Sequence, residues 1–136
     1  MSTYSPFVAA LHVFIGGGAG AVLRWQLGRA MTGWLGAPIV TAFPFATLAA
    51  NAAGSLLMGA LAGWLARHGS GEGEQLRLLL GVGLLGGFTT FSALSLEIVL
   101  MIERGQLLFA ALYVMLSLGL GVTGLVLGLN LMRLPG

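Results

Sequence analysis

Long runs without charge are the feature that most limits how this chain can fold. Asp, Glu, Lys and Arg are absent from residues 1–23, 30–66, 78–96 and 105–132. A helix needs about 20 apolar residues to cross a ~30 Å hydrocarbon core, so each run can hold one crossing. Charged residues make up only 7% of the chain, too few to cover the surface of a soluble fold. We therefore predict an all-α integral membrane protein.

The runs predict a single transmembrane domain over residues 1–136, made of four helices. The expected spans cover about residues 7–29, 45–66, 75–102 and 106–132. Gly36, Pro38 and Pro44 interrupt the first part of the second run, which predicts a loop before the second span. A chain of this length leaves no room for a separate soluble domain.

The arginines are balanced between the two sides of the predicted membrane domain. Four crossings place Arg67, Arg77 and Arg133 on one side and Arg24, Arg29 and Arg104 on the other. Orientation normally follows an imbalance of Lys and Arg between short loops, and none exists here. The sequence therefore predicts insertion in both orientations, which suits an antiparallel, dual-topology homodimer.

The third span contains a segment that disfavours a continuous helix. Gly86 and Gly87 are followed, after one phenylalanine, by the β-branched pair Thr89 and Thr90, a combination with low helix propensity. Unwound backbone in a membrane is tolerated where it is buried in protein or lines a cavity, and its freed carbonyls can bind a cation. The residues alone leave two interpretations open, a broken helix and an intact helix with a glycine-rich packing face.

Neutral polar side chains recur at helical spacing in the second and fourth spans. Thr47, Asn51 and Ser55 share one stripe, and Tyr113 and Ser117 share another, because residues four apart lie on one face. Interhelical hydrogen bonding explains such stripes without any ligand, more convincingly for Thr and Ser than for a costly buried Asn.

A dehydrated anion is the ligand that these side chains suit. Amide and hydroxyl groups supply donors, and the ring edge of Phe91 supplies positive partial charge. Glu97 is the only acidic residue near a span interior and lies toward the end of the third span; we expect it to be structural. Arg24 is either a cation at one membrane face or a snorkelling interfacial residue. Composition indicates a small anion without choosing which.

Enzymatic chemistry has no support in the sequence. The chain contains no cysteine, which excludes thiol nucleophiles, thiolate metal sites and disulfides. It has no Walker loop, catalytic triad or metal-ligand cluster, and its glycine run at residues 16–20 lies inside an apolar span, not after a strand. The scattered arginines leave no nucleic-acid footprint. We therefore predict that the protein is not an enzyme.

Three segments together resemble the Fluc, or CrcB-like, family of fluoride channels. They are GGGAGAVLRW (Gly16–Trp25), TLAANAAGSLLMG (Thr47–Gly59) and GLLGGFTTFSALSLE (Gly83–Glu97), in order on successive spans. The resemblance covers essentially the whole chain. It implies passive, fluoride-selective export across a bacterial inner membrane, through two pores of an antiparallel homodimer whose third helices are broken at mid-membrane.

The resemblance also implies roles for individual residues. A structural Na⁺ at the dimer centre would be held by backbone carbonyls of Gly86 and Thr89. Asn51 matches a donor to the anion, Phe91 matches the first pore phenylalanine, and Arg24 matches a first-helix arginine near a vestibule. The other positions that match the pore are Thr90, Ser92, Leu94, Tyr113 and Ser117.

Two positions depart from the family pattern. Leu94 stands where a second pore phenylalanine is usual, and an aliphatic side chain lacks a positive ring edge. Gly121 stands where a serine often extends the fourth-helix stripe. We expect these departures to affect conduction and not the fold.

Two other classes of membrane protein provide alternatives. A small multidrug-resistance-type antiporter also has four helices and can insert both ways, but that class needs a glutamate embedded in its first helix. No acidic residue precedes Glu72 here. A purely structural membrane subunit leaves the polar stripes unexplained. The antiporter is therefore kept as the alternative to a fluoride channel.

Overall fold

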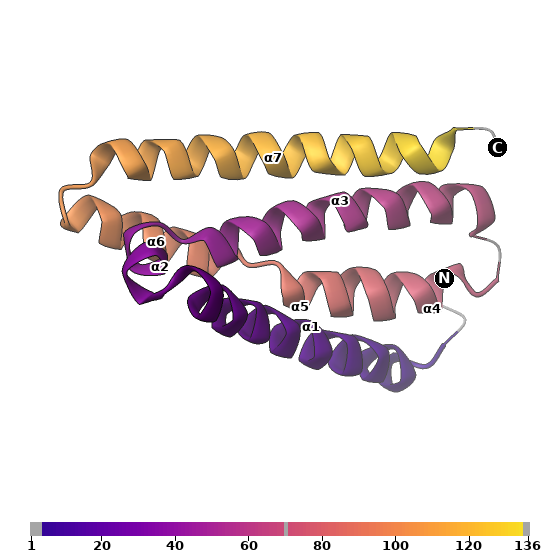
Figure 1. The fold of residues 1–136 in the computed structure, drawn as a ribbon. Helices are drawn as coiled ribbons and strands as arrows, with labels where there is room; N and C mark the ends of the chain where they lie inside the picture. Colours follow the sequence, from indigo (N-terminus) through magenta and orange to yellow (C-terminus); the bar gives the residue numbers. More distant parts are fainter. Residues whose placement is uncertain (1–3, 70, 135–136) are drawn as a thin grey trace.

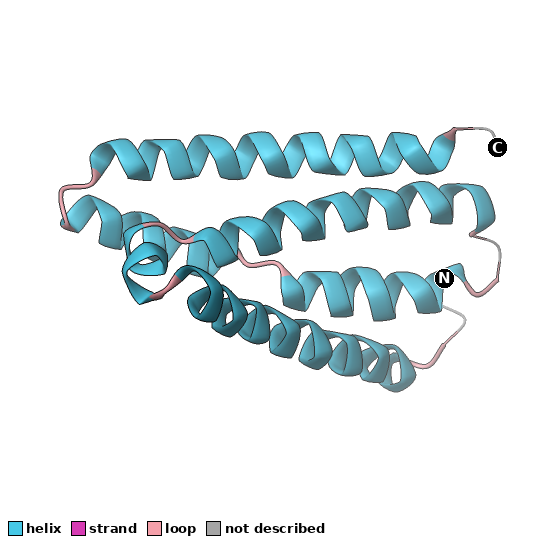
Figure 2. Ribbon diagram, in the orientation of Figure 1, coloured by secondary structure: helices cyan, strands magenta, loops and turns pink. Residues whose placement is uncertain are grey.

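The computed structural model describes residues 4–69 and 71–134, and in them every regular element is a helix (Figure 2). The elements are α1 (Pro6–Leu35), α2 (Ala37–Ala42), α3 (Phe45–His68), α4 (Gly73–Leu76), the π-helix η1 (Arg77–Leu85), α5 (Gly86–Phe88), α6 (Phe91–Glu103) and α7 (Leu107–Arg133). Four helical stretches are long and apolar enough to span a membrane: Pro6–Leu35, Phe45–His68, Gly73–Glu103 and Leu107–Arg133. The prediction of an all-helical chain with four such stretches is confirmed.

Local signals set both ends of α1. The hydroxyl oxygen of Ser5 accepts a hydrogen bond from the backbone N–H of Val8 at 3.3 Å, and a proline occupies the first helical position, where its missing N–H costs nothing. At the other end Gly36 adopts a positive φ of 87°, which glycine tolerates. Its N–H donates to the carbonyl oxygen of Thr32 at 3.0 Å.

The stretch predicted to be a loop before the second span is mostly helical, so that prediction was wrong. α1 continues to Leu35 and α2 follows directly after Gly36. Pro38 lies in the first turn of α2, where proline is compatible with a helix because no intrahelical N–H is needed there. Pro44 directly precedes α3, so Gly36 and Pro44 mark the helix boundaries on either side of the short α2 helix.

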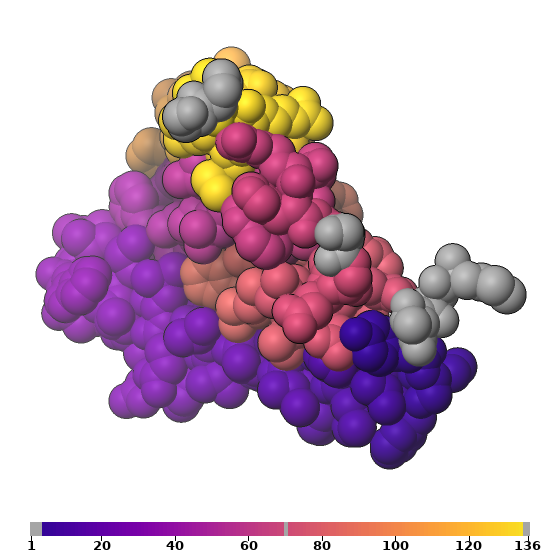
Figure 3. Space-filling view, turned by 90° about the vertical axis from the view of Figure 1, so that its right-hand side faces the viewer, coloured from indigo at the N-terminus to yellow at the C-terminus, as the bar shows by residue number. Residues whose placement is uncertain are grey.

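The helices pack in two close pairs. In Figure 1, α7 lies along α3, while α1 lies along the stretch formed by η1 and α5. Seen from one end in Figure 3, α7 is at the top, α3 is below it, and the first half of α1 is at the bottom. The α6 helix continues beyond α5 and packs against the first part of α7. The membrane-length helices therefore form one bundle in which α6 and α2 lie at the same end.

Glycines allow the backbones in these pairs to touch. A methyl group would collide with the backbone of a facing helix at Gly16 and Gly20 of α1, Gly83 of η1, Gly59 of α3 and Gly128 of α7. In lipid, close packing of small residues replaces the hydrophobic effect as the main force between helices. The high glycine content therefore serves helix packing.

The single chain buries few large side chains. Met101 and Tyr113 are the largest that are fully buried, and they pack with Ala110. Many large hydrophobic side chains are exposed on all the long helices, as a surface in contact with lipid or another membrane protein requires. The bundle thus fits a multi-pass membrane protein.

Candidate functional site

The backbone between α5 and α6 is extended at two residues. Thr89 has φ −83° and ψ 157°, and Thr90 has φ −151° and ψ 125°. Thr89 bonds backward, because both its N–H and its hydroxyl donate to the carbonyl oxygen of Leu85. Thr90 bonds forward, since its hydroxyl oxygen accepts from the N–H of Ala93 at 3.2 Å and caps α6. The two threonines therefore end one helix and begin the next.

The side-chain amide of Asn51 in α3 forms two hydrogen bonds with the backbone of this extended segment. Its Nδ2 donates to the carbonyl oxygen of Thr90 at 3.0 Å, and its Oδ1 accepts from the N–H of Thr90 at 2.8 Å. The bond from the N–H of Thr90 replaces the helical partner that this N–H lacks, and the Asn51 amide adds a second donor to the Thr90 carbonyl, which as the N-cap of α6 also faces the first turn of that helix. Asn51 thus forms the interhelical hydrogen bonds that the sequence offered as an explanation without a ligand. The second hydrogen of Nδ2 is left without a partner among the residues described.

Phe91 begins α6 and points away from the core of its own chain. Its side chain is 81% exposed, and Ser92 beside it is also exposed. The hydroxyl groups of Thr90 and Ser92 lie 3.4 Å apart. A cavity of about 280 Å³ is lined by Asn51, Gly54, Ser55, Met58, Thr89, Thr90, Phe91, Leu94 and Leu125. The structure therefore brings Asn51, Thr90, Phe91 and Leu94 together at one cavity.

Tyr113 and Ser117 lie elsewhere and differ in their bonding. The Tyr113 side chain is fully buried, and its hydroxyl donates to Oε2 of Glu97 at 2.5 Å. The Ser117 hydroxyl oxygen is buried and has no hydrogen-bond partner. Neither residue lines the cavity at Phe91. Among the predicted pore residues, Ser117 is thus the one whose hydroxyl is left free.

The sequence did not predict that the Glu97 carboxylate accepts hydrogen bonds from two hydroxyl groups on neighbouring helices. Thr47 of α3 donates to Oε1 of Glu97 at 2.7 Å, and Tyr113 of α7 donates to the other oxygen. Glu97 therefore joins three helices, in agreement with the structural role expected for it. Thr47 lies one turn before Asn51, and Glu97 is the single acidic residue near a span interior, so the signals were present without the partner assignment.

The buried Tyr113 ring packs against Phe43, which contacts a further aromatic ring. Phe43, in the segment between α2 and α3, lies 5.4 Å from the Tyr113 ring and 4.8 Å from the Phe45 ring, centroid to centroid. Leu94 is partly buried against the same group, beside Met101. Leu94 consequently lines the cavity at Phe91 and also packs against the buried cluster of Met101, Ala110 and Tyr113.

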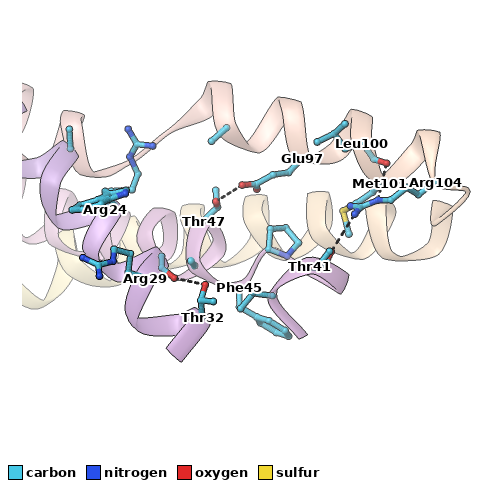
Figure 4. Close-up of a pocket in the computed structure, with 17 residues that line it drawn as sticks. Arg24, Arg29, Thr32, Thr41, Phe45, Thr47, Glu97, Leu100, Met101 and Arg104 are labelled. Atoms are coloured by element: carbon cyan, nitrogen blue, oxygen red, sulfur yellow. Dashed lines mark hydrogen bonds between the residues drawn. The ribbon is translucent and has the colours of Figure 1, made fainter. Parts of the chain in front are cut away.

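Arg24 interacts with the end of α5. Its Nε donates to the carbonyl oxygen of Gly87 at 3.4 Å, a carbonyl whose helical partner is lost where α5 ends. A cation is favourable there because it complements the negative end of the helix dipole. Arg24 also lines a larger cavity of about 970 Å³ between α1, α2, α3 and α6 (Figure 4). Its position is compatible with both a vestibule residue and a helix cap.

The carbonyl groups predicted to bind Na⁺ can be tested for fit. Within the residues described, the carbonyl oxygens of Gly86 and Thr89 accept no hydrogen bond, because Thr90 and Ala93 donate to side chains instead. Gly86 is exposed. Neutral oxygen ligands suit a hard cation, so these two free carbonyls fit the predicted ion. No cluster of three or more His, Asp or Glu side chains occurs in the described part of the chain.

Comparison with known proteins gives a consistent result. The family described as "CrcB-like protein, Camphor Resistance (CrcB)" matches residues 11–129. A protein of Erythrobacter litoralis named fluoride-specific ion channel FluC is 62% identical over 134 residues, covering 98% of both chains. Proteins with the same name from Novosphingobium aromaticivorans and Phenylobacterium zucineum are 60% and 52% identical, covering 92% of this chain and 96% and 95% of theirs. The chain therefore belongs to the CrcB-like family, a family of ion channels and not of enzymes.

Proposed function

We propose that this protein is a fluoride-selective channel that lets F⁻ leave the cytoplasm passively and so relieves fluoride toxicity. The main support is the near end-to-end similarity to proteins named fluoride-specific ion channel FluC. Fluoride enters cells as the neutral weak acid and dissociates inside, so the anion can leave down its electrochemical gradient without an energy source. This function places the protein in the inner (plasma) membrane of a bacterium.

Neutral donors next to an aromatic ring carry the proposed selectivity. A narrow pore must replace the hydration shell of F⁻ at several sites, each weak enough to allow exit. Asn51, which has one amide hydrogen free, and Phe91 both line the 280 Å³ cavity, and an amide N–H and an aromatic ring edge both carry positive partial charge. Thr90 and Ser92 lie beside Phe91. Ser117, whose buried hydroxyl has no partner among the described residues, extends the polar pathway along α7, next to Tyr113, whose hydroxyl hydrogen is donated to Glu97.

A second copy of the chain would complete the pathway. Phe91 is 81% exposed, and an exposed ring cannot strip water from an ion because bulk solvent or lipid lies on its open side. Gly86, with its free carbonyl, is exposed nearby in the chain. An antiparallel homodimer encloses both features and repeats them, which yields two pores, and the balanced arginines fit such dual topology.

Na⁺ is the proposed structural ion at the centre of this dimer. The break in the third helix, which we place at mid-membrane, frees the carbonyls of Gly86 and Thr89. When bound, the cation neutralises these negative carbonyl ends. Arg24 lies at the Gly87 carbonyl, so the chain itself supplies one cation to the broken segment, and the Gly86 and Thr89 carbonyls are left for Na⁺.

Purified protein reconstituted in liposomes tests the proposed function. We expect a fluoride electrode to record rapid F⁻ release once a K⁺ ionophore balances charge, while a chloride electrode records none from matched vesicles. Vesicles without protein provide the control for leakage. Equal release of chloride, or release of neither ion, would contradict the proposal. No observation favours the alternative antiporter, whose required first-helix glutamate this sequence lacks.

A further inference from the structure

The larger cavity has an unusual concentration of arginine. It measures about 970 Å³ and lies between α1, α2, α3 and α6. In Figure 4, Arg24 and Arg29 come from α1 at one side of the cavity, and Arg104 comes from the end of α6 at the other. Glu97 is the one acidic residue in the lining. The cavity thus has a net positive lining.

The three arginines are held in place without carboxylate partners. Arg104 donates from Nε to the carbonyl oxygen of Leu100 at 3.2 Å and from Nη1 to that of Thr41 at 3.5 Å. The Arg29 guanidinium lies 5.1 Å from the centre of the Trp25 ring, and stacking of this kind leaves its N–H groups free. Within the described residues no arginine forms an ion pair. Several guanidinium N–H groups are therefore available to an anion.

The hydroxyl and carboxylate groups of the cavity already form hydrogen bonds within the protein. The hydroxyls of Thr32 and Thr41 donate to backbone carbonyls within their own helices. The two carboxylate oxygens of Glu97 accept from Thr47 and Tyr113. These hydroxyls have no hydrogen left for a ligand, so among the side chains of the lining the donors available to an anion are the guanidinium groups and the indole N–H of Trp25.

Guanidinium groups match phosphate better than they match a halide. Their planar forks bind phosphate oxygens in pairs, and a cavity of about 970 Å³ far exceeds what a monatomic ion occupies. Apolar side chains, including Val40, Phe45 and Leu100, also line it. A ligand that combines a phosphate with an apolar part can bind both the arginines and the apolar side chains of the lining.

Tryptophans at the cavity suit a position at the membrane–water interface, where phospholipid headgroups lie. Trp25 lines the cavity, and Trp34, which is 78% exposed, lies near the same end of α1; tryptophan is enriched at membrane–water interfaces. Basic pockets between transmembrane helices are suited to anionic headgroups. We propose that this cavity binds the phosphodiester headgroup of an anionic phospholipid through Arg29, while Arg104 on the opposite side adds to the positive potential that attracts it. This proposal requires only that the protein lies in a membrane and is independent of fluoride conduction.

Native mass spectrometry of the detergent-purified full chain tests the proposal. Phosphatidylglycerol and phosphatidylcholine are added at equal concentration, and the bound molecules are counted. We expect about a tenfold preference for phosphatidylglycerol, and about a fivefold loss of its binding for each of Arg29→Gln and Arg104→Gln. Arg77→Gln is the matched control, because Arg77 is exposed and lies outside the cavity; it should bind like the unmodified protein.

Competition with inorganic phosphate separates the two sources of a phosphate group. If millimolar phosphate leaves phosphatidylglycerol bound, the lipid is the ligand; if it displaces the lipid completely, the cavity is a free-phosphate site and the lipid proposal is wrong. Equal binding of the two lipids, or unchanged binding in both cavity variants, also overturns it. A normal oligomeric state in the same spectra shows that the variants are folded.

Discussion

The two cavities of this protein differ in the charge of the side chains that line them. The larger one is lined by three arginines and holds its single carboxylate between two hydroxyl donors. The smaller one, at Phe91, has no charged side chain in its lining. A positive cavity concentrates any anion, because Coulomb attraction does not distinguish one anion from another. In the proposed function, discrimination therefore falls to the neutral cavity, where donors and ring edges would replace water at short range.

The comparison also shows how a neutral site is kept in shape. Asn51 is tied to Thr90 by two hydrogen bonds, so the donor geometry depends on an extended backbone segment and not on charge. In the larger cavity the arginines are positioned by backbone carbonyls and by a tryptophan ring. Changes in the neutral cavity should consequently alter conduction most.

The strongest test of the neutral cavity is Phe91→Ile. Loss of the ring edge removes the positive partial charge proposed to face the ion, and we expect fluoride flux to fall by about a hundredfold, or about 2.7 kcal/mol in the barrier. Flux is measured with a fluoride electrode in liposomes. Phe14→Ile is the matched control, since Phe14 is 78% exposed on α1 and lines neither cavity. Unchanged flux in the Phe91 variant, with an intact oligomer, would remove this residue from the pathway.

Asn51→Ala should have the next largest effect. Thr90 loses the partner of its N–H and one donor to its C=O, and an unsatisfied buried group costs about 1–3 kcal/mol. We expect lower thermal stability in detergent and about a tenfold lower flux. Ser55→Ala, one turn further along the same stripe, should change stability little. Normal flux and stability for Asn51→Ala would mean that the extended segment keeps its shape without the amide.

Loss of the hydroxyl donors to Glu97 should have an intermediate effect, which we expect in stability. Tyr113→Phe removes a hydroxyl that donates to the carboxylate, and a hydrogen bond to a charged group contributes about 1.5–3 kcal/mol. Thr47→Val removes the other donor. We expect the double variant to lose more stability than the two single losses combined, because the carboxylate then has no donor in either place. Strict additivity in denaturation measurements would show that the two donors act independently.

Leu94→Phe should have the smallest effect on flux. The added ring enters a partly buried position beside Met101 and Tyr113, and overpacking costs about 1–3 kcal/mol. We expect flux to remain within about threefold of the unmodified protein while relative anion occupancy changes. Leu96→Phe is a suitable control on the same helix, because Leu96 is 59% exposed. Flux that falls as far as in the Phe91 variant would mean that Leu94 is essential where it stands.

Much of the membrane architecture was predictable from the sequence. The absence of charge over long runs predicts the four membrane-length helices, and the threonine pair after Gly86 and Gly87 marks the place where α5 ends. The loop predicted before the second span was wrong, because a proline in a first helical turn permits the helix that a proline in its middle forbids. Position along a helix, not composition, decided that case.

Hydropathy and helix-breaking residues act over a few neighbours, so the sequence by itself determined the membrane character, the number of long helices and the candidate polar residues. Tertiary structure decided which polar groups are satisfied and which are free. Asn51 and Thr90 are 39 residues apart, and Thr47 and Glu97 are 50 apart. Whether such groups bind each other or a ligand depends on the packing of helices, because hydrogen bonds require contact within about 3 Å. That distance is a property of the folded bundle and not of any one segment.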